Sequence, residues 1–446
     1  MTIGKQRAKP GYSVIIITGI AFSAVWFGYR AVQLAGTDAH TYHIDYNVFY
    51  MAWQSVLHTG GNPYAEQISP ATPYLYPPLF AQLFSPLGLL SVQAAAGVWY
   101  AIGILALAAS LLISERLVFT DTKHKINFAL IALSFVAIAR FGLDNLRMGQ
   151  INLLVVAVVL LALYLFEKNR IWPAAIVLAT AISFKLTPAL FLIYFLAKRE
   201  WRFVFKTSAI AGSLNVASFV PMGRNAPAVF NYWYNLIILN KQGFGWGYHG
   251  NQSWRALVNR FLTDENTGAP HIQHINFAVN RSAADIVYYI GVAIIVLLIA
   301  WAANSKTGRS GTRESIFENI SSNAVEYGLV FCGMLMISSL SWKDHYVALI
   351  LPYTVLINYA VFAGKSFERT VAATMLTLSF LLCTMTNMGI IGGHWAETLE
   401  TFSAVFLGVV ILFAALLFIR TRGLNAATES EIPNDIRHRI EERVQA

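Results

Sequence analysis

Charged residues are scarce in this sequence, because Asp, Glu, Lys and Arg make up only 12% of its 446 residues. A soluble protein carries roughly twice that fraction, about 25%. Apolar residues take the place of the missing charge: they form 56% of the chain and recur in runs of about 18 residues or more. These features exclude a soluble globular protein and predict an all-α polytopic membrane protein.

Cysteine is nearly absent as well. Cys332 and Cys383 both fall inside apolar segments, which argues against a disulfide framework and favours buried side chains that behave as small hydrophobes. The sequence also lacks a glycine-rich phosphate-binding motif and a Gly-x-Ser-x-Gly elbow. His271 and His274 have no third ligand at a familiar spacing, so we expect no divalent metal.

The net charge of +9 indicates topology rather than nucleic-acid binding, because most Lys and Arg residues lie in short loops. Lys5, Arg7 and Lys9 place the start of the chain in the cytoplasm, ahead of an apolar run that lacks a signal-peptide cleavage site. We expect transmembrane segments at about 12–34, 92–113, 126–142, 151–166, 204–222, 283–302, 324–340, 346–363, 370–388 and 399–420. Residues 1–420 then form one integral membrane domain, and residues 421–446 a charged cytoplasmic tail, so both termini are cytoplasmic.

Residues 171–197 fit either one span or a hairpin of two half-length helices hinged at residues 185–188. Basic residues flank both ends, at Lys168 and at Lys198. A single crossing places the second group outside, whereas a hairpin keeps both groups inside, and Pro188 breaks the helix at the hinge. We therefore predict the hairpin, with its apex in the outer half of the membrane; in all, about 11–12 transmembrane or half-membrane helices are expected.

A stretch at residues 43–50 organises the predicted outer face. Asp45 lies there among aromatic residues and precedes a short amphipathic run, which is typical of a helix lying in the membrane interface. Two interpretations of Asp45 stay open: a helix N-cap, or a general base, because a carboxylate that loses water becomes a stronger base. Asp38 competes with it for the second role. We expect the outer loops 35–91 and 223–282 to form the active-site face.

Further ionisable residues fall on the same face, where a charge at membrane depth predicts function. Lys185 is either a snorkelling or structurally paired lysine or a ligand for a phosphate group. Lys343, Asp344 and His345 lie together between two predicted spans, a grouping that leaves both a structural and a functional role open. The other ionisable residues on this face are Arg147, His249 and Arg255.

Two amide-containing segments are candidates for binding hydroxyl groups. Gln150 and Asn152 open the predicted fourth span, as ordinary polar residues of a helix start or as a hydrogen-bonding lining for a sugar. Asn251 and Gln252 follow a glycine-rich stretch and suit a hydroxylated ligand.

In their order along the chain, these segments resemble glycosyltransferase family 87. Over about residues 40–350, the resemblance is carried by Asp45 with its tyrosine-rich run and by the motifs Gly61-Asn62-Pro63-Tyr64, Tyr76-Pro77-Pro78, Gly149-Gln150-Ile151-Asn152, Lys185-Leu186-Thr187-Pro188, Asn251-Gln252-Ser253 and Ser341-Trp342-Lys343-Asp344-His345. Members of this family are bacterial membrane enzymes with the GT-C fold, including polyprenyl-phosphate-mannose-dependent mannosyltransferases. Family members often have a His-His pair where this chain has Asp344-His345, so the resemblance extends to His345 and leaves Asp344 open.

The resemblance implies an inverting glycosyltransferase on the outer face of the bacterial inner membrane. The expected donor is a polyprenyl-phosphate sugar, with mannose as the expected sugar, and the acceptor is a hydroxyl of a glycolipid or glycan. The resemblance implies Asp45 as the general base, a catalytic role for His345, and Lys185, Arg147 and Lys343 as ligands of the donor phosphate. Contacts to the sugar or acceptor are expected from Tyr46, Tyr50, Gln150, Asn152, Asn251 and Gln252. The donor is a substrate, so no cofactor is expected, and neither is nucleic acid.

Three alternatives stay open. A GT-C enzyme that transfers arabinose or aminoarabinose fits equally, because sugar identity depends on a few pocket contacts. A lipid or polysaccharide transporter predicts paired broken helices in two related halves, whereas this sequence has one broken hairpin and no second copy. A non-enzymatic membrane scaffold leaves Asp45, Lys185 and His345 on one face without an explanation.

Overall fold

The computed structural model describes residues 45–66, 73–119, 125–239, 245–275, 277, 279–304, 321–363 and 366–430. Within these residues the protein is built of helices and contains no β-strand, which confirms the predicted all-α class. The helices that carry the following argument are α2 (Asp45–His58), α3 (Pro78–Phe84), α4 (Val92–Val118), α5 (Phe128–Met148), α6 (Asn152–Glu167), α7 (Ile171–Phe184), η2 (Thr187–Ala189), α8 (Leu190–Ala197), α9 (Trp201–Ala217), α10 (Ala226–Trp233), α11 (Trp254–Leu262), α12 (Arg281–Asn304), α13 (Ser322–Ile337), η6 (Lys343–Leu349), α14 (Ile350–Ile357), α15 (Ser366–Met385), α16 (Met388–Ile391), α17 (Gly393–Thr401) and α18 (Ala404–Ser430).

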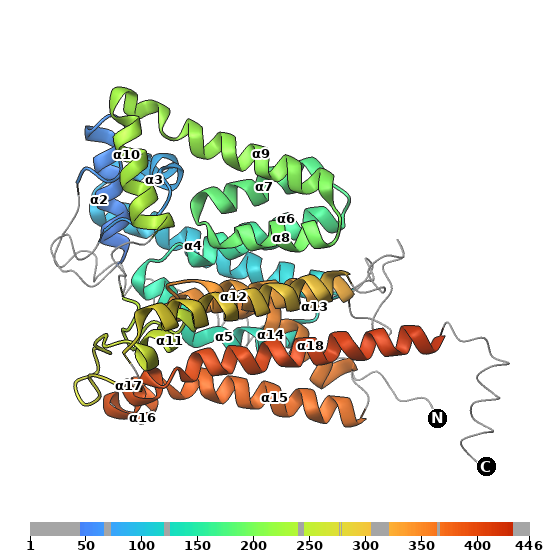
Figure 1. The fold of residues 1–446 in the computed structure, drawn as a ribbon. Coiled ribbons are helices and arrows are strands. Elements are labelled where there is room, and N and C mark those ends of the chain that lie inside the picture. Colours follow the sequence, from blue (N-terminus) through green and yellow to red (C-terminus); the bar gives the residue numbers. More distant parts are fainter. Residues whose placement is uncertain are drawn as a thin grey trace, which may run out of the picture.

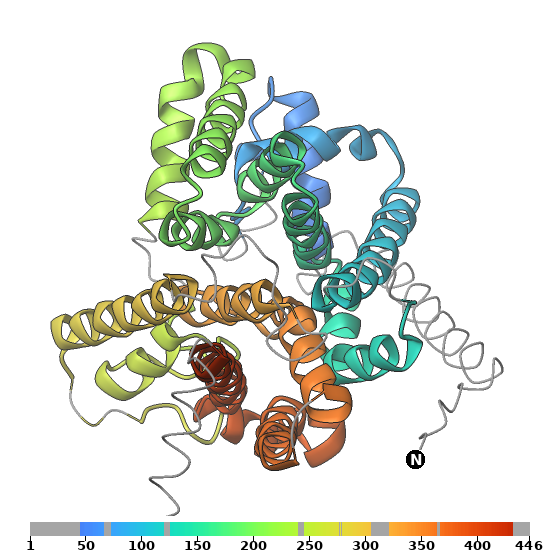
Figure 2. The same ribbon diagram turned by 90° about the vertical axis from the view of Figure 1, so that its right-hand side faces the viewer.

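Most of the long helices run along one direction, and α2, α10, α11, α16 and α17 gather at one end of them (Figure 1). Seen along that direction, helices α7 to α10 lie on one side and helices α11 to α18 on the other (Figure 2). At the end where α2, α10, α11, α16 and α17 gather, residues that are far apart in the sequence therefore come together.

Four helices of the described part of the chain are long and apolar enough to cross a membrane: α4, α5, α12 and α18. A fifth results if α9 and the segment Val220–Leu236, which follows it at a bend of 66°, count as one span. The spans predicted at 151–166 and 324–340 are the shorter helices α6 and α13, and the one predicted at 346–363 begins inside the 3-10 helix η6. The first predicted span and the chain beyond residue 430 lie outside the described residues.

The predicted hairpin is confirmed by the contacts at its open end. Glu167, just before α7, accepts hydrogen bonds from Asn323 and Tyr327 of α13 at 2.9 and 2.6 Å. Lys198, just after α8, forms an ion pair of 2.7 Å with Glu326 of the same helix. Both ends of the hairpin therefore meet one end of α13, and the chain reverses between them at residues 185–189 (Figure 1).

An aromatic cluster fixes α2 against the helices beneath it. Phe49 and Trp53 are at most 1% exposed. The Phe49 ring lies 5.2 Å from Phe80 of α3 and 6.0 Å from Trp99 of α4, and Trp53 lies 5.5 Å from Trp99. Each aromatic pair adds about 0.5–1.5 kcal/mol beyond its buried area. The packing of this face determines where Asp45, the first residue of α2, is presented.

The ion pairs of Glu326 predict a stability effect at the other end of the bundle. This side chain is 1% exposed and lies 2.7 Å from Lys198 and 2.8 Å from Arg420. Truncating one partner of a buried pair costs about 3–5 kcal/mol, because it leaves charge buried without compensation. We expect Glu326→Ala to lower the free energy of unfolding by about that amount, read as a lower midpoint of thermal unfolding in detergent. An unchanged midpoint contradicts this account of how the hairpin is closed.

Candidate active site

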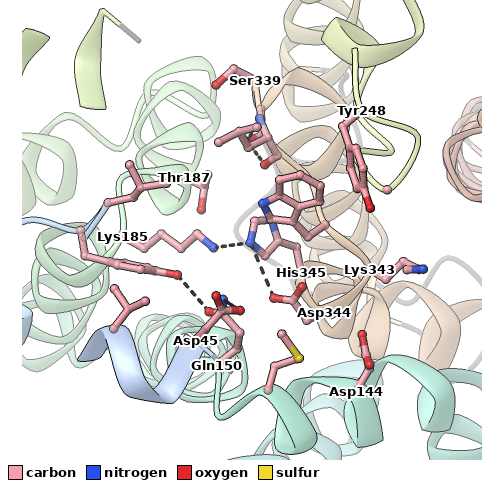
Figure 3. A pocket seen from close by; sticks show the side chains of 18 of the residues that line it. Asp45, Asp144, Gln150, Lys185, Thr187, Tyr248, Ser339, Lys343, Asp344 and His345 are labelled. Atoms are coloured by element: carbon pink, nitrogen blue, oxygen red, sulfur yellow. Dashed lines mark hydrogen bonds and ion pairs between the residues drawn. The ribbon is translucent and has the colours of Figure 1, made fainter. Parts of the chain in front are cut away.

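A cavity of about 610 Å³ lies at the end of the bundle where α2 begins. Its wall is built from separate parts of the chain: the start of α2, residues 73–77, the end of α5, the break after α7, residues 248–250 and residues 338–345. Figure 3 shows how charged and polar side chains from these segments converge on it.

Asp45 is held at this cavity by a chain of two hydrogen bonds. Its Oδ2 accepts a hydrogen bond of 2.5 Å from Gln150 Nε2, and Gln150 Oε1 accepts one of 2.9 Å from the Tyr76 hydroxyl. Burial raises the pKa of Asp45 above its ordinary value, and the Gln150 hydrogen bond and the charge of Lys185 offset part of that rise. The carboxylate is therefore oriented and more basic than an exposed one.

Gln150 reaches Asp45 because α5 ends in a left-handed residue. Gly149 follows α5 with φ of 66°, a conformation that glycine adopts without a steric penalty. A Cβ atom at this position would lie 2.6 Å from the Cβ of Tyr46. Trp99 Nε1 donates a hydrogen bond of 2.7 Å to the Gly149 carbonyl. The close approach of α2, α4 and α5 thus depends on this glycine.

Lys185 lies in the break between α7 and η2 and reaches the opposite segment of the wall. Its Nζ donates to Asn152 Oδ1 at 2.5 Å and to His345 Nε2 at 3.0 Å. Asn152 Nδ2 in turn donates to Asp344 Oδ2 at 2.7 Å. One ammonium group thereby connects the hairpin apex, the start of α6 and η6.

The carboxyl group of Asp344 and the imidazole of His345, both in η6, have shifted pKa values. Burial raises the pKa of Asp344 to about 7, with further contributions from the other carboxylates nearby. Burial and the neighbouring ammonium group lower the pKa of His345 well below its ordinary value. His345 is therefore a neutral imidazole, and since its Nε2 accepts the Lys185 hydrogen bond, its proton lies on Nδ1.

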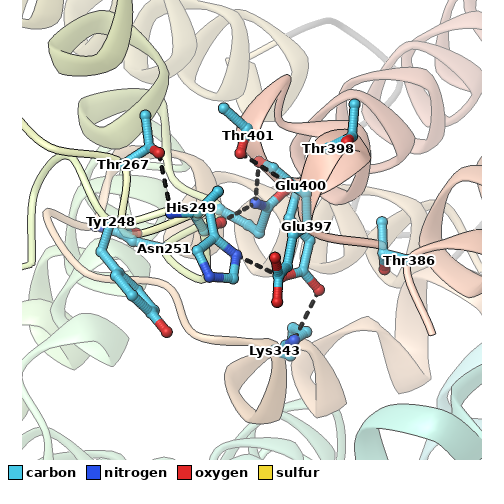
Figure 4. Close-up of polar contacts among 12 residues, drawn as sticks. Tyr248, His249, Asn251, Thr267, Lys343, Thr386, Glu397, Thr398, Glu400 and Thr401 are labelled. Atoms are coloured by element: carbon cyan, nitrogen blue, oxygen red, sulfur yellow. Dashed lines mark hydrogen bonds and ion pairs between the residues drawn. The ribbon is translucent and has the colours of Figure 1, made fainter. Parts of the chain in front are cut away.

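A second cluster, centred on Glu400 of α17, supports another part of the wall (Figure 4). Its fully buried carboxylate pairs with Lys343 Nζ at 2.7 Å and with His249 Nδ1 at 2.9 Å, and Arg140 lies 3.5 Å away. Burial on its own raises the pKa of Glu400, but the hydrogen bond from His249 and the charge of Lys343 hold it below its ordinary value. The group is therefore an anion that binds three parts of the chain together.

Six of the residues predicted for the site line the cavity: Asp45, Arg147, Gln150, Lys185, Lys343 and His345. Asn152 is buried and contacts Lys185 from behind the wall. Arg147 is paired with Asp144 at 2.8 Å, and 57% of its side chain is exposed. Arg255 lies elsewhere, against Asp285 at 2.5 Å.

Tyr46 and Tyr50, predicted to contact sugar or acceptor, are not among the lining residues. Their hydroxyl groups donate to the carbonyls of Val92 and Leu90, at 2.7 and 2.8 Å. In this structure both tyrosines attach α2 to the chain just before and at the start of α4.

Asn251 and Gln252 are fully buried and also lie outside the lining. Asn251 Nδ2 donates to the Ser339 carbonyl at 2.9 Å, and Gln252 Nε2 donates to the Glu400 carbonyl at 2.7 Å. These amides join the glycine-rich loop to the two segments behind it, so they position the wall rather than form its surface.

Three residues near the cavity are not marked by any sequence motif: Glu400, Asp144 and Tyr248. Glu400 lies 57 residues from Lys343 and 151 from His249, so no local pattern marks it. Tyr248 belongs to a glycine-rich stretch that looks flexible from its composition. In the described part of the chain, no group of three His, Cys, Asp or Glu side chains is placed to hold a metal ion; the expectation that none is needed stays a prediction.

Comparisons with known proteins add to this geometry. The sequence model of glycosyltransferase family 87 matches residues 74–317. A polyprenol-phosphate-mannose-dependent alpha-(1-2)-phosphatidylinositol mannoside mannosyltransferase of Mycobacterium tuberculosis is 27% identical over 426 residues, which cover 90% of each chain. A protein of the same name from Mycolicibacterium smegmatis is 28% identical over 393 residues, or 82% of each chain. The crystal structure of ArnT from Cupriavidus metallidurans bound to undecaprenyl phosphate aligns with a TM-score of 0.41 at 14% identity, over 94% of this chain and 79% of that one.

The conformation of Gly149 predicts the effect of adding one methyl group. We expect Gly149→Ala to destabilise the protein by about 1–3 kcal/mol, because a φ of 66° and the overlap with Tyr46 both act against alanine. The matched control is Gly212→Ala within α9, where no atom beyond the adjacent helix backbone lies within 4 Å of the added Cβ and alanine favours the helix by about 0.5–1 kcal/mol. Thermal unfolding compares the two variants, and equal midpoints contradict the account.

Proposed function

Because the chain belongs to glycosyltransferase family 87, we propose that it is an inverting mannosyltransferase with a polyprenyl-phosphate-mannose donor. Membership of the family confirms the predicted enzyme class, a glycosyltransferase. The acceptor we propose is a hydroxyl group of a glycolipid, since the relatives above are named for phosphatidylinositol mannosides. The observation that carries the proposal is the presence of an oriented carboxylate, Asp45, and a half-buried ammonium, Lys185, in one cavity.

Asp45 acts as the general base in this proposal. Its carboxylate takes the proton of the acceptor hydroxyl while that oxygen attacks the anomeric carbon of the donor. The bond between the anomeric carbon and the phosphate oxygen breaks, polyprenyl phosphate leaves with the electron pair, and the configuration inverts. The pKa of Asp45, which burial raises, supports this role because it makes the carboxylate a stronger base. The hydrogen bond from Gln150 supports it by fixing the orientation of the carboxylate.

Lys185 stabilises the negative charge that develops on the departing phosphate. Its bond to neutral His345 leaves the ammonium charge available at the cavity, and His345 and Asn152 hold its position. Arg147 is a weaker candidate for the same task, because it already pairs with Asp144 and is largely exposed.

The reaction takes place on the outer face of the bacterial inner membrane. Lys168, Arg170, Lys198 and Arg199 flank the open end of the hairpin, whereas Lys185 and the cavity lie at its apex. Basic residues favour the cytoplasmic side, so the cavity faces outward. By the same rule, Lys5, Arg7 and Lys9 assign the start of the chain to the cytoplasm.

The role of Asp45 predicts a loss of transfer in Asp45→Asn. A general base contributes about 10²–10⁴-fold to the rate, so we expect kcat to fall by at least about 100-fold. The assay uses purified protein in nanodiscs with radiolabelled polyprenyl-phosphate mannose and phosphatidylinositol mannoside. Asp144→Asn is the matched control, since this carboxylate lines the same cavity but pairs with exposed Arg147. Normal transfer by folded Asp45→Asn, or equal losses in both variants, contradicts the assignment.

The Gln150 hydrogen bond predicts a shift in the pH profile. This bond lowers the pKa of Asp45, so removing it in Gln150→Leu raises that pKa further. Because the base must be deprotonated to act, we expect the acidic limb of the kcat/KM profile to move to higher pH. Tyr76→Phe keeps the direct bond to Asp45 and is expected to shift the limb less. A lower rate with an unmoved acidic limb contradicts the idea that Asp45 is the titrating group.

A further inference from the structure

The wall that includes Tyr248 and Lys343 has no role in the mechanism above. Figure 3 shows these two side chains on the side of the cavity away from Lys185. The ring of Trp342 lies 5.7 Å from that of Tyr248 in an edge-to-face arrangement. The wall therefore presents two aromatic rings beside one ammonium group, all three among the cavity-lining residues.

Glycines set the positions of these rings. A Cβ atom at Gly268 or at Gly250 would lie 2.5 or 2.7 Å from ring carbons of Tyr248, and one at Gly245 would lie 3.1 Å from the Trp342 ring. Both rings thus rest against backbone that has no side chain in the way. Gly245 and Gly250 of the glycine-rich stretch, together with Gly268, therefore leave space for the two rings. This packing explains the glycine content of the stretch better than flexibility does.

Glu400 holds this wall from behind. It pairs with Lys343 at 2.7 Å and with His249 at 2.9 Å, and its backbone carbonyl accepts the Gln252 hydrogen bond at 2.7 Å. Lys343 is nevertheless 26% exposed, and an ammonium group has three protons, so the bond to Glu400 leaves protons for a ligand in the cavity.

We propose that Tyr248, Trp342 and Lys343 form the acceptor subsite, and that Glu400 is a positioning residue for it. The ligand class is a glycosylated lipid with an anionic group: the rings bind the apolar faces of sugar residues, and the ammonium binds the anion. This inference rests on the proposed function, because it assumes that Lys185 holds the donor phosphate. It also assigns Lys343 to the acceptor side rather than to the donor phosphate, the role that the family resemblance implies.

The test measures KM for each substrate separately, with polyprenyl-phosphate mannose as donor and phosphatidylinositol mannoside as acceptor. We expect Lys343→Met and Glu400→Gln each to raise the acceptor KM about tenfold or more, because each variant loses one charge-assisted contact to the acceptor. The donor KM is expected to stay unchanged. Glu400→Asp restores part of the effect, because it keeps the charge. With an uncharged alkyl mannoside as acceptor, Lys343→Met is expected to have the KM of the wild type.

Glu326→Gln is the matched control, since it also neutralises a buried, ion-paired glutamate but lies at the opposite end of the molecule. We expect this variant to lower the unfolding temperature without changing the acceptor KM. Lys343→Met keeps the test decisive if Glu400→Gln does not fold. An increase in donor KM, or an unchanged acceptor KM, overturns the subsite while the proposed function stands. A wild-type protein that transfers no mannose contradicts the proposed function and overturns the subsite with it.

Discussion

The candidate active site depends on the pairing of one half-buried ammonium group, that of Lys185. Burying a charge is costly unless partners surround it, and removing one partner of such a group is strongly destabilising. Lys185 donates hydrogen bonds to Asn152 and His345, and Asn152 in turn donates one to Asp344. The requirement to satisfy this charge brings together the hairpin apex, the start of α6 and η6, which are far apart in the sequence.

The rest of the cavity is assembled around that contact. α6 begins just after Gly149, whose left-handed conformation directs Gln150 toward Asp45. α2 brings Asp45 to the same place, because its aromatic face packs on α3 and α4. Glu400 fixes the opposite wall by the same physical rule, a buried charge satisfied by partners from several segments. Two charge clusters therefore define two walls, and the space between them is where we place the two substrates.

Part of this arrangement was predictable from sequence, because it follows from local chemistry. The balance of basic residues at Lys168 and Lys198, with Pro188 between them, predicted the hairpin and the placement of Lys185 at its apex. The isolated carboxylate of Asp45 before an amphipathic run predicted the start of α2, whereas its catalytic role stays a prediction. Motif order suggested the family, and the family match confirmed it.

Other parts depend on tertiary contacts that local patterns do not encode. Tyr46 and Tyr50 have the composition of a sugar-binding surface, yet their hydroxyl groups bond to backbone carbonyls before α4 and at its start. Asn251 and Gln252 are equally polar in sequence, and burial makes them supports for the wall. Glu400 could not be found at all, since its partners are distant in sequence and only the packing of α17 brings them near.

The central claim is that Lys185, held in place by His345 and Asn152, receives the phosphate of a polyprenyl-phosphate donor while Asp45 faces the reacting carbon. The most direct measurement is a cryo-electron microscopy structure of the protein in nanodiscs with bound polyprenyl phosphate. The account predicts a phosphate oxygen within hydrogen-bonding distance of Lys185 Nζ, on the Asp45 side of the cavity. A phosphate bound by Lys343 or Arg147, with Lys185 still paired only to Asn152 and His345, would contradict it.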